Sequence, residues 1–304
     1  MSIVSVKDLK KSYNKGKTQA LKGVSFEVEP GEIFGLIGPD GAGKTSLFRI
    51  LTTLILADSG SAKVDGHDVI KEYKTIRQHI GYMPGRFSLY QDMTVEENLS
   101  FFATVFNTTI EENYHLVEDI YKQIEPFKTR RAGKLSGGMK QKLALSCALI
   151  HAPHVLFLDE PTTGVDPVSR KEFWDMLQKL KRNFNLSIIV STPYMDEAVQ
   201  CDRIALIQAG SFLTIDTPQS IISNYTETLW AVCSNQMHKL LNDLRNINGI
   251  KTAFAFGENH HATVDTTVLT IDSLKAQLAI MGHRNIFINE VEPSIEDCFM
   301  NLQK

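Results

Sequence analysis

The sequence lacks the features that would place it in a membrane or outside the cell. None of its apolar runs approaches the ~20 residues that a helix needs to cross a bilayer, and the longest, at 155–158 and 188–190, have the length of buried strands. The first eight residues lack the basic-then-apolar layout of a signal peptide. The cysteines are few and form no CxxC pair, so we expect buried thiols in a reducing cytoplasm. They are Cys147, Cys201, Cys233 and Cys298. Any contact with a membrane is therefore expected to come through another chain.

A strong excess of one charge is also missing. The 304 residues carry 32 basic and 35 acidic side chains, a formal net charge of −3. Neither an anionic membrane nor nucleic acid is favoured by that balance as the main partner, so we expect no nucleic acid among the partners. The 43% of apolar residues is ordinary for a globular protein, and the length suggests about two domains.

The apolar pattern divides the chain near residue 217. Residues 3–6 and 24–28 alternate as strands, and 95–106, 112–123 and 137–150 carry apolar residues at helical spacing. From residue 154 onward strands and helices alternate, which predicts a buried parallel sheet with helices on its faces. We therefore predict a domain over residues 1–217, with a helical subdomain at about 90–152, and a small α+β domain over 218–304. In the second domain His260 and His261 follow a polar stretch and are expected in a solvated turn.

A glycine-rich loop follows the short apolar strand predicted at 33–37. Gly38-x-x-x-x-Gly43-Lys44-Thr45 is the P-loop pattern, and the helix predicted at 46–56 gives it the expected context. Glycines let backbone N–H groups surround phosphates, and the helix directs its N-terminus at the same anion. Lys44 is expected to reach the β- and γ-phosphates of ATP, and the Thr45 hydroxyl to bind Mg²⁺. The predicted phosphate loop comprises Gly38, Pro39, Asp40, Gly41, Ala42, Gly43, Lys44, Thr45 and Ser46.

Two acidic residues end the apolar strand predicted at 155–158. Asp159 is expected to hold Mg²⁺ through water or Thr45, and Glu160 to polarise the attacking water. Together with the phosphate loop they predict a site for ATP hydrolysis.

A second possible phosphate cradle begins the helix predicted at 137–150. Ser136, Gly137 and Gly138 offer free N–H groups and a hydroxyl at a helix start. Because the chain already has one cradle, this one is expected to cover a nucleotide held by a partner chain.

In combination these motifs resemble the ATPase subunit of an ATP-binding-cassette (ABC) transporter over roughly residues 3–216. The resemblance implies a P-loop ABC-type nucleotide-binding domain, with a mixed sheet and a helical subdomain, that binds ATP and Mg²⁺. It also implies that two such subunits, identical or different, enclose two ATP molecules. In this family an aromatic residue at the position of Tyr13 stacks on adenine, and Asp166 matches an aspartate loop that crosses the dimer interface.

Segments 81–84, 191–198 and 291–297 resemble the drug-resistance exporter type, whose ATPase works with an ABC-2-type membrane permease. The resemblance implies ATP-driven export, and a cytoplasmic subunit held at the inner face of the cell membrane through the permease. A surface around residues 86–106 is expected to receive a short permease helix. Its candidate lining residues are Phe87, Leu89, Tyr90, Phe101 and Phe102.

Two positions depart from the family pattern. Gly85 stands where a glutamine usually contacts Mg²⁺ and water, and Pro193 stands where a histidine usually contacts the γ-phosphate. Loss of such a donor costs about 10²–10³ in rate, by analogy with oxyanion-hole donors. Three interpretations are open: slow hydrolysis as a homodimer through Glu160, a weak half of a heterodimer, or a subunit that mainly binds ATP. The heterodimer is slightly favoured, because Ser136–Gly138 is intact.

Translation or DNA-repair ATPases are disfavoured, since the sequence has one cassette, no heptad arm and no Cys/His cluster.

Overall fold

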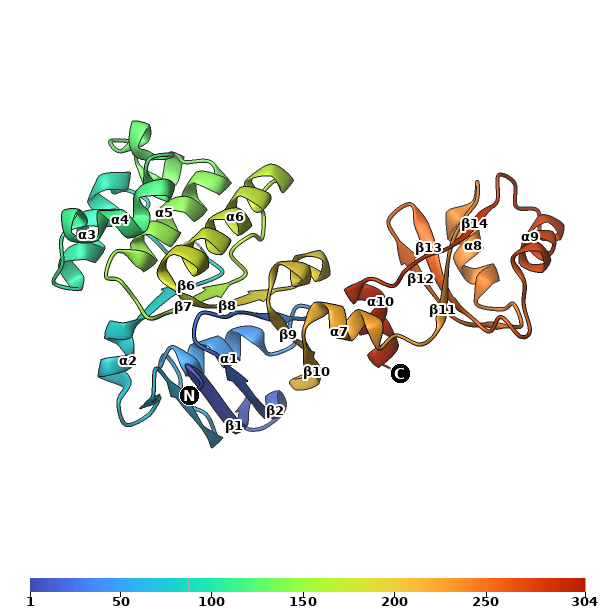
Figure 1. Ribbon diagram of the computed structural model, residues 1–304, viewed down its shortest axis with the longest axis horizontal. Coiled ribbons are helices and arrows are strands. Elements are labelled where there is room, and N and C mark those ends of the chain that lie inside the picture. The colour runs from blue at the N-terminus through green and yellow to red at the C-terminus, as the bar shows by residue number, and fades with distance from the viewer. Residues whose placement is uncertain (87, 304) are drawn as a thin grey trace. The chain divides into compact units, whose positions relative to one another are not determined.

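The computed structural model describes residues 1–86 and 88–303. The chain forms two compact units, Met1–Pro218 and Gln219–Lys304, whose elements are labelled in Figure 1. Phe87, one of the candidate lining residues for the permease helix, lies outside the described residues. Within the described ranges, no helix is both long and apolar enough to cross a bilayer.

A mostly parallel sheet forms the base of the larger unit. Its strands are, in spatial order, β10 (Ser211–Asp216), β9 (Arg203–Gln208), β3 (Ile33–Ile37), β8 (Ser187–Thr192), β7 (Val155–Asp159) and β6 (Ile80–Met83). All neighbours are parallel except β10 with β9. Every residue of β3, β7 and β8 is buried, as in parallel strands covered on both faces. Because parallel strands end at one edge, β3, β7 and β8 bring the residues that follow them together.

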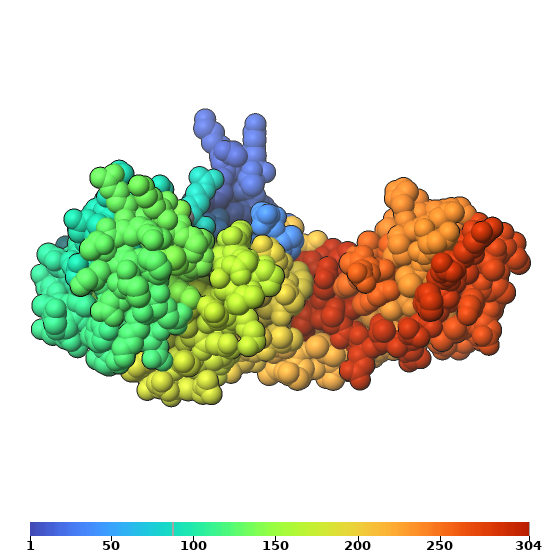
Figure 2. Space-filling view, turned by 90° about the horizontal axis from the view of Figure 1, so that it is seen from above, coloured from blue at the N-terminus to red at the C-terminus, as the bar shows by residue number. Residues whose placement is uncertain are grey.

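A second, antiparallel sheet belongs to the same unit. Its strands are, in spatial order, β2 (Thr18–Val28), β1 (Val4–Tyr13), β4 (Ser59–Val64) and β5 (His67–Asp68). β1 and β2 are longer than the alternation predicted, because their register shifts between Val6 and Leu9, where Asp8 adopts a φ of 45°. Such an irregularity interrupts the alternation that marks a strand. The tip of this hairpin, in blue, projects from the first unit in Figure 2.

Several helices of the first unit begin where the sequence provides a capping side chain. The helices of this unit are α1 (Lys44–Leu51), α2 (Tyr73–His79), α3 (Val95–Val105), α4 (Ile110–Tyr121), α5 (Gly137–Leu149) and α6 (Pro167–Phe184), with 3-10 turns η1 (Glu125–Phe127), η2 (Ala132–Lys134) and η3 (Met195–Gln200). Thr94 and Thr109 form capping boxes at α3 and α4. Phe48 of α1 packs edge-on against Phe157 of β7, with ring centroids 5.7 Å apart. In Figure 1, α3, α4 and α5 gather in one helical region on the opposite side of β6 and β7 from α1.

The smaller unit is an antiparallel sheet with two helices packed on one core. Its elements, starting at the boundary, are α7 (Pro218–Ser223), β11 (Thr228–Cys233), α8 (Met237–Leu244), β12 (Ile250–Phe256), β13 (Asn259–Val264), α9 (Ile271–Ile280), β14 (Phe287–Glu290) and α10 (Ile295–Leu302). The strand order is β12-β13-β11-β14. Its core contains Trp230 from the sheet, Leu240 of α8 and Leu274 of α9.

The solvated turn expected at His260 and His261 is wrong. Both residues lie in β13, and His260 is only 5% exposed, with Nε2 2.7 Å from the Met237 carbonyl oxygen. His261 Nδ1 lies 2.8 Å from Asp297 Oδ1. Hydrogen bonds to these partners let a polar stretch enter a buried strand.

Candidate functional site

The loop between β3 and α1 requires glycine at two positions because the backbone passes close to other strands. A Cβ at Gly38 would lie 2.1 Å from the Ile207 carbonyl oxygen, and one at Gly43 would lie 2.3 Å from that of Ala20. Gly43 also has a φ of 109° and directly precedes α1. The loop therefore holds its backbone N–H groups at the start of a helix, the arrangement that binds phosphate groups. Within the loop Pro39, Asp40 and Gly41 are exposed, whereas Ala42 is buried.

Lys44 points into this loop from the first position of α1. It is 3% exposed, and its Nζ donates to the carbonyl oxygens of Gly38 at 2.8 Å and Pro39 at 3.1 Å. The same Nζ lies 3.3 Å from Glu160 Oε1. The structure thus brings together the lysine and the carboxylate that the sequence predicted for one site.

Three oxygen-bearing side chains meet beside Lys44. The Thr45 hydroxyl donates to Asp159 Oδ1 at 3.4 Å, and the Ser191 hydroxyl donates to the same oxygen at 2.5 Å. Asp159 is 2% exposed. A buried carboxylate beside a hydroxyl is a donor set that suits Mg²⁺, which prefers oxygen ligands. The residues present therefore fit the ion that Thr45 and Asp159 were expected to hold.

Sequence reasoning missed the contact of Ser191 with Asp159. Ser191 lies opposite Asp159 in the parallel pairing of β7 and β8. A hydroxyl residue near the end of an apolar strand is the signal that indicates such a partner, once the two strands are known to be neighbours.

Glu160 has an unusual backbone conformation. Its φ is 51°, in the left-handed region that costs energy for a residue with a Cβ. Its N–H donates to Ser191 O at 3.0 Å and Ser191 Oγ at 3.1 Å, which holds the turn. The carboxylate remains 23% exposed. The backbone of Glu160 is thus fixed while water can reach its carboxylate, an arrangement that suits a general base.

Tyr13 lies beside the loop at the end of β1. Its hydroxyl is 3.2 Å from Ser46 Oγ, and the residue is 37% exposed. An exposed aromatic ring next to a phosphate-binding loop is in a position to stack on a base.

The second predicted cradle lies at the starts of α5 and α6. Ser136 caps α5 by accepting from Met139 N–H at 3.3 Å, and Asp166 caps α6 by accepting from Val168 and Ser169. The N–H of Ser169 in particular lowers the Asp166 pKa. A Cβ at Gly138 would lie 2.7 Å from Ser169 Oγ, so glycine allows the two helix starts to approach. Ser136, Gly137 and Asp166 are exposed at this surface.

The two departures from the family pattern lie at the same sheet edge. Gly85 follows β6, and a Cβ there would lie 3.0 Å from the Asp159 carbonyl oxygen. Pro193 follows β8, whose last residue, Thr192, accepts the Tyr194 N–H at 3.1 Å. Neither Gly85 nor Pro193 has a side-chain donor.

A cavity of about 470 Å³ lies between the sheet and the helical region. Leu89 and Phe102, two of the candidate residues for the permease surface, are among its lining residues, together with Gly85 and His151. Tyr90 and Phe101 are exposed and are not among its lining residues; they pack on each other edge-on at 4.9 Å. Burial lowers the His151 pKa, so this ring is neutral in the cavity wall at pH 7.

Comparison with known proteins identifies relatives along the whole chain. A family model described as ABC transporter matches residues 21–163. The chain is 36% identical over 305 residues to the probable multidrug ABC transporter ATP-binding protein YbhF of Escherichia coli, covering 99% of the chain and 52% of YbhF. It thus spans about half the length of that relative. It is 34% identical over 275 residues to the doxorubicin resistance ATP-binding protein DrrA of Mycobacterium tuberculosis, covering 89% of the chain and 79% of DrrA.

Among solved structures, too, the chain is similar to ATP-binding cassettes of ABC transporters. The chain is similar to cbiO1 of Clostridium perfringens, part of the ABC transporter complex cbiONQ, with a TM-score of 0.66 and 27% identity over 73% of this chain and 91% of that one. It is also similar to an ATP-binding cassette solved as a dimer in a post-hydrolysis state with ADP and Pi, with a TM-score of 0.64 and 25% identity over 70% and 98% of the two chains. The predicted cassette fold, α/β with a small additional α+β unit, is confirmed. The chain belongs to the family of ABC transporter ATP-binding proteins.

Proposed function

We propose that this chain is the ATP-binding and ATP-hydrolysing subunit of an exporter, and that it drives a separate ABC-2-type membrane permease by ATP-dependent dimer closure. The observation that carries the proposal is the meeting of Lys44, Thr45, Asp159 and Glu160 at one sheet edge. Relatives named for multidrug transport, doxorubicin resistance and Nod factor export support the direction of transport.

The residues of the site divide the work on ATP. Backbone N–H groups of the loop and the Lys44 ammonium bind the phosphates, while Thr45 and Asp159 hold Mg²⁺. The ion supplies charge neutralisation for the transferred phosphoryl group. Glu160 accepts a proton from the attacking water. The loop residues concerned are Gly38, Pro39, Asp40, Gly41, Ala42, Gly43 and Ser46.

The Lys44–Glu160 pair links binding to catalysis. Without nucleotide the two charges, 3.3 Å apart, neutralise each other. Phosphate oxygens compete for the ammonium, because they offer it more negative charge. The Glu160 carboxylate is then released to act as a base.

The exposed helix starts at α5 and α6 are proposed to complete the site of a second subunit. Ser136, Gly137, Gly138 and Asp166 present donors and a carboxylate on one surface. We infer that Tyr13 stacks on the adenine of the chain's own ATP, and that the partner's helix start covers its phosphates.

The permease helix is proposed to bind in the cavity lined by Leu89 and Phe102. A mostly apolar cavity of this kind can accept the apolar face of an amphipathic helix. Docking there would hold the subunit at the inner, cytoplasmic face of the membrane.

The division into an ATP-binding domain of residues 1–217 and an accessory domain of residues 218–304 stays a prediction.

A second candidate function rests on Gly85 and Pro193. Without the glutamine and histidine donors, the chain serves as the weak half of a heterodimer, and its Ser136–Gly138 surface completes a stronger site on another subunit. To separate the two functions, the ATP turnover of the purified chain is compared with that of a Gly85→Gln, Pro193→His double variant. A large gain in the double variant favours the heterodimer. Equal, substantial rates favour an active homodimer.

Equilibrium binding of Mg–ATP tests the proposal itself. Lys44→Met is expected to lose most of the affinity, because it removes the buried cation of the loop. The control is Lys142→Met, since Lys142 is paired with Glu172 outside the loop. Equal affinities of Lys44→Met and the control would contradict a phosphate site at this loop.

A further inference from the structure

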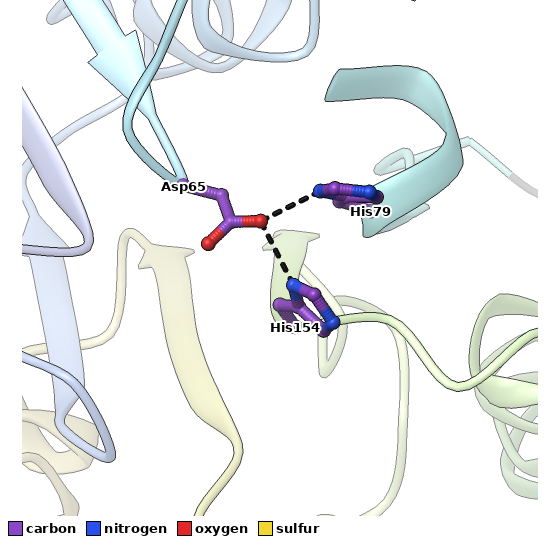
Figure 3. A group of neighbouring side chains, drawn as sticks. All are labelled: Asp65, His79 and His154. Carbon is purple, nitrogen blue, oxygen red and sulfur yellow. Dashed lines mark hydrogen bonds and ion pairs between the residues drawn. The ribbon is translucent and has the colours of Figure 1, made fainter. Parts of the chain in front are cut away.

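A group of side chains at the end of the parallel strands opposite the ATP site has the composition of a transition-metal site. Asp65 lies in the turn between β4 and β5, His79 ends α2, and His154 directly precedes β7 (Figure 3). Asp65 Oδ2 lies 2.6 Å from His79 Nδ1 and 2.8 Å from His154 Nδ1. One ligand atom from each residue lies within 4.8 Å of the others. The residues that follow β7 form the ATP site, so the length of this strand, roughly 16 Å, separates the two places.

The backbone holds these three residues in place before any ion binds. His154 N–H donates to the His79 carbonyl oxygen at 2.8 Å, and Asp65 N–H donates to that of Ile3 at 2.7 Å. Asp65 and Gly66 have φ values of 51° and 77°, the conformation of a tight two-residue hairpin turn that Asp-Gly favours. Because each ligand is anchored to a strand or helix end, little ordering remains to be done on binding.

We propose that Asp65, His79 and His154 bind one divalent transition-metal ion, with Zn²⁺ as the preferred ion. Imidazole nitrogen and carboxylate oxygen form Zn²⁺ sites with three protein ligands and one water. At Zn–ligand distances of about 2.0–2.2 Å, tetrahedral neighbours lie roughly 3.3 Å apart. The two hydrogen-bonded pairs therefore open by roughly half an ångström. A metal ion binds the neutral imidazole, so any proton held at Nδ1 is released to water and Nε2 carries the ring N–H of the bound form.

The surroundings leave room for the water ligand and for entry. A cavity of about 440 Å³ is lined by Asp65 and His154, with Asn185 and Ser187 among its polar residues. The side chains of Asp65, His79 and His154 are 21%, 31% and 58% exposed. Mg²⁺ is a poor competitor here, because it prefers oxygen ligands and gives up its water reluctantly.

A bound ion would join three segments of the first unit: the β4–β5 turn, the end of α2 and the loop before β7. Because β6 follows His79 directly and β7 follows His154, the ion would fix the starts of two strands that lead to Gly85 and Glu160. Ligand binding to the folded state alone raises its stability. At a Zn²⁺ concentration 100-fold above the Kd, the unfolding temperature of this unit is expected to rise by roughly 5–10 °C.

Titration of the full chain with ZnCl₂, without nucleotide and with excess Mg²⁺, tests the proposal. We expect the wild type to bind Zn²⁺ saturably. In each of His79→Gln, His154→Gln and Asp65→Asn, the affinity of one site should fall at least about tenfold, since loss of even an outer partner of a metal ligand costs 10–100-fold. Asp65→Asn keeps the turn, because Asn also tolerates a positive φ. His238→Gln is the control, since His238 is an exposed histidine of α8.

Co²⁺ provides a readout that general binding to histidines does not. The wild type is expected to show the visible absorption of tetrahedral Co²⁺, and the His79 and His154 variants to lose it while keeping wild-type circular dichroism. Absence of saturable Zn²⁺ binding in the wild type would overturn the proposal. So would binding that is unchanged in the His79→Gln and His154→Gln variants. Neither result bears on the ATP site.

Discussion

Replacement of Ser191 tests the geometry of the site most sharply. Its hydroxyl donates to Asp159 Oδ1 at 2.5 Å, and the two residues are 0% and 2% exposed. Ser191→Ala leaves a buried carboxylate short of a donor, and a hydrogen bond to a charged group contributes about 1.5–3 kcal/mol. We expect the free energy of unfolding of the first unit to fall by that amount. The substitution also removes the hydrogen bond from the Glu160 N–H to the Ser191 hydroxyl. This loss adds little to the cost, because the same N–H still donates to the Ser191 carbonyl oxygen at 3.0 Å.

The two tryptophans allow this unit to be followed by itself. Trp174 lies in α6 of the first unit and Trp230 in β11 of the second, and each is 3% exposed. In a Trp230→Phe background, urea unfolding followed by fluorescence therefore reports the first unit. The matched control is Ser146→Ala, which removes an equally buried hydroxyl bonded at 2.9 Å to a carbonyl of its own helix. The reasoning is refuted if Ser191→Ala loses no more stability than Ser146→Ala.

The same variant has a second expected effect, on Mg²⁺. Loss of an outer partner of a metal ligand lowers metal affinity by about 10–100-fold. The Mg²⁺ concentration that half-saturates ATP binding should therefore rise by this factor in Ser191→Ala. An unchanged Mg²⁺ requirement would mean that Asp159 does not hold the ion.

Three further predictions concern other parts of the first unit. Tyr13→Ala should weaken ATP binding by roughly 5- to 150-fold in a binding titration, since base stacking contributes about 1–3 kcal/mol, whereas Tyr13→Phe should keep it. Hydrogen bonds from the Lys11 ammonium and, to a smaller extent, from Ser12 lower the pKa of Asp58 from 3.8 to about 2. Asp58 therefore stabilises the fold above pH 4, and this contribution is lost as the pH falls through about 2. The free energy of unfolding of Asp58→Asn should depend less on pH over this range, as measured by acid unfolding. Phe102→Glu should abolish co-purification with the permease, whereas Phe101→Glu, outside the cavity, should not.

The phosphate loop could be predicted because its signal is local. A buried strand, glycines, Lys44 and a helix follow one another within a few residues, and the apolar strand before Asp159 and Glu160 gives a second local signal. Parallel strands ending at one edge then bring the two together.

Contacts that depend on register or on the facing side of a helix could not be predicted. Ser191 meets Asp159 only because β8 lies next to β7 with these residues opposite each other. His154 reaches Asp65 across 89 positions of the chain. Tyr90 and Phe101 had the right residue types for the cavity, but they are exposed and are not among its lining residues. Strand β13 was missed because its histidines look like a polar loop until their buried partners are known.

Steady-state ATP turnover of Glu160→Gln, beside the wild type, tests the central claim most directly. Loss of a general base costs about 10²–10⁴ in rate, so turnover should fall by this factor. ATP affinity should be kept or increased, because Lys44 loses its competing carboxylate. Glu172→Gln is the control, since Glu172 is half exposed and paired with Lys142 away from the loop. Turnover equal to that of the wild type would contradict hydrolysis by Glu160 at this site.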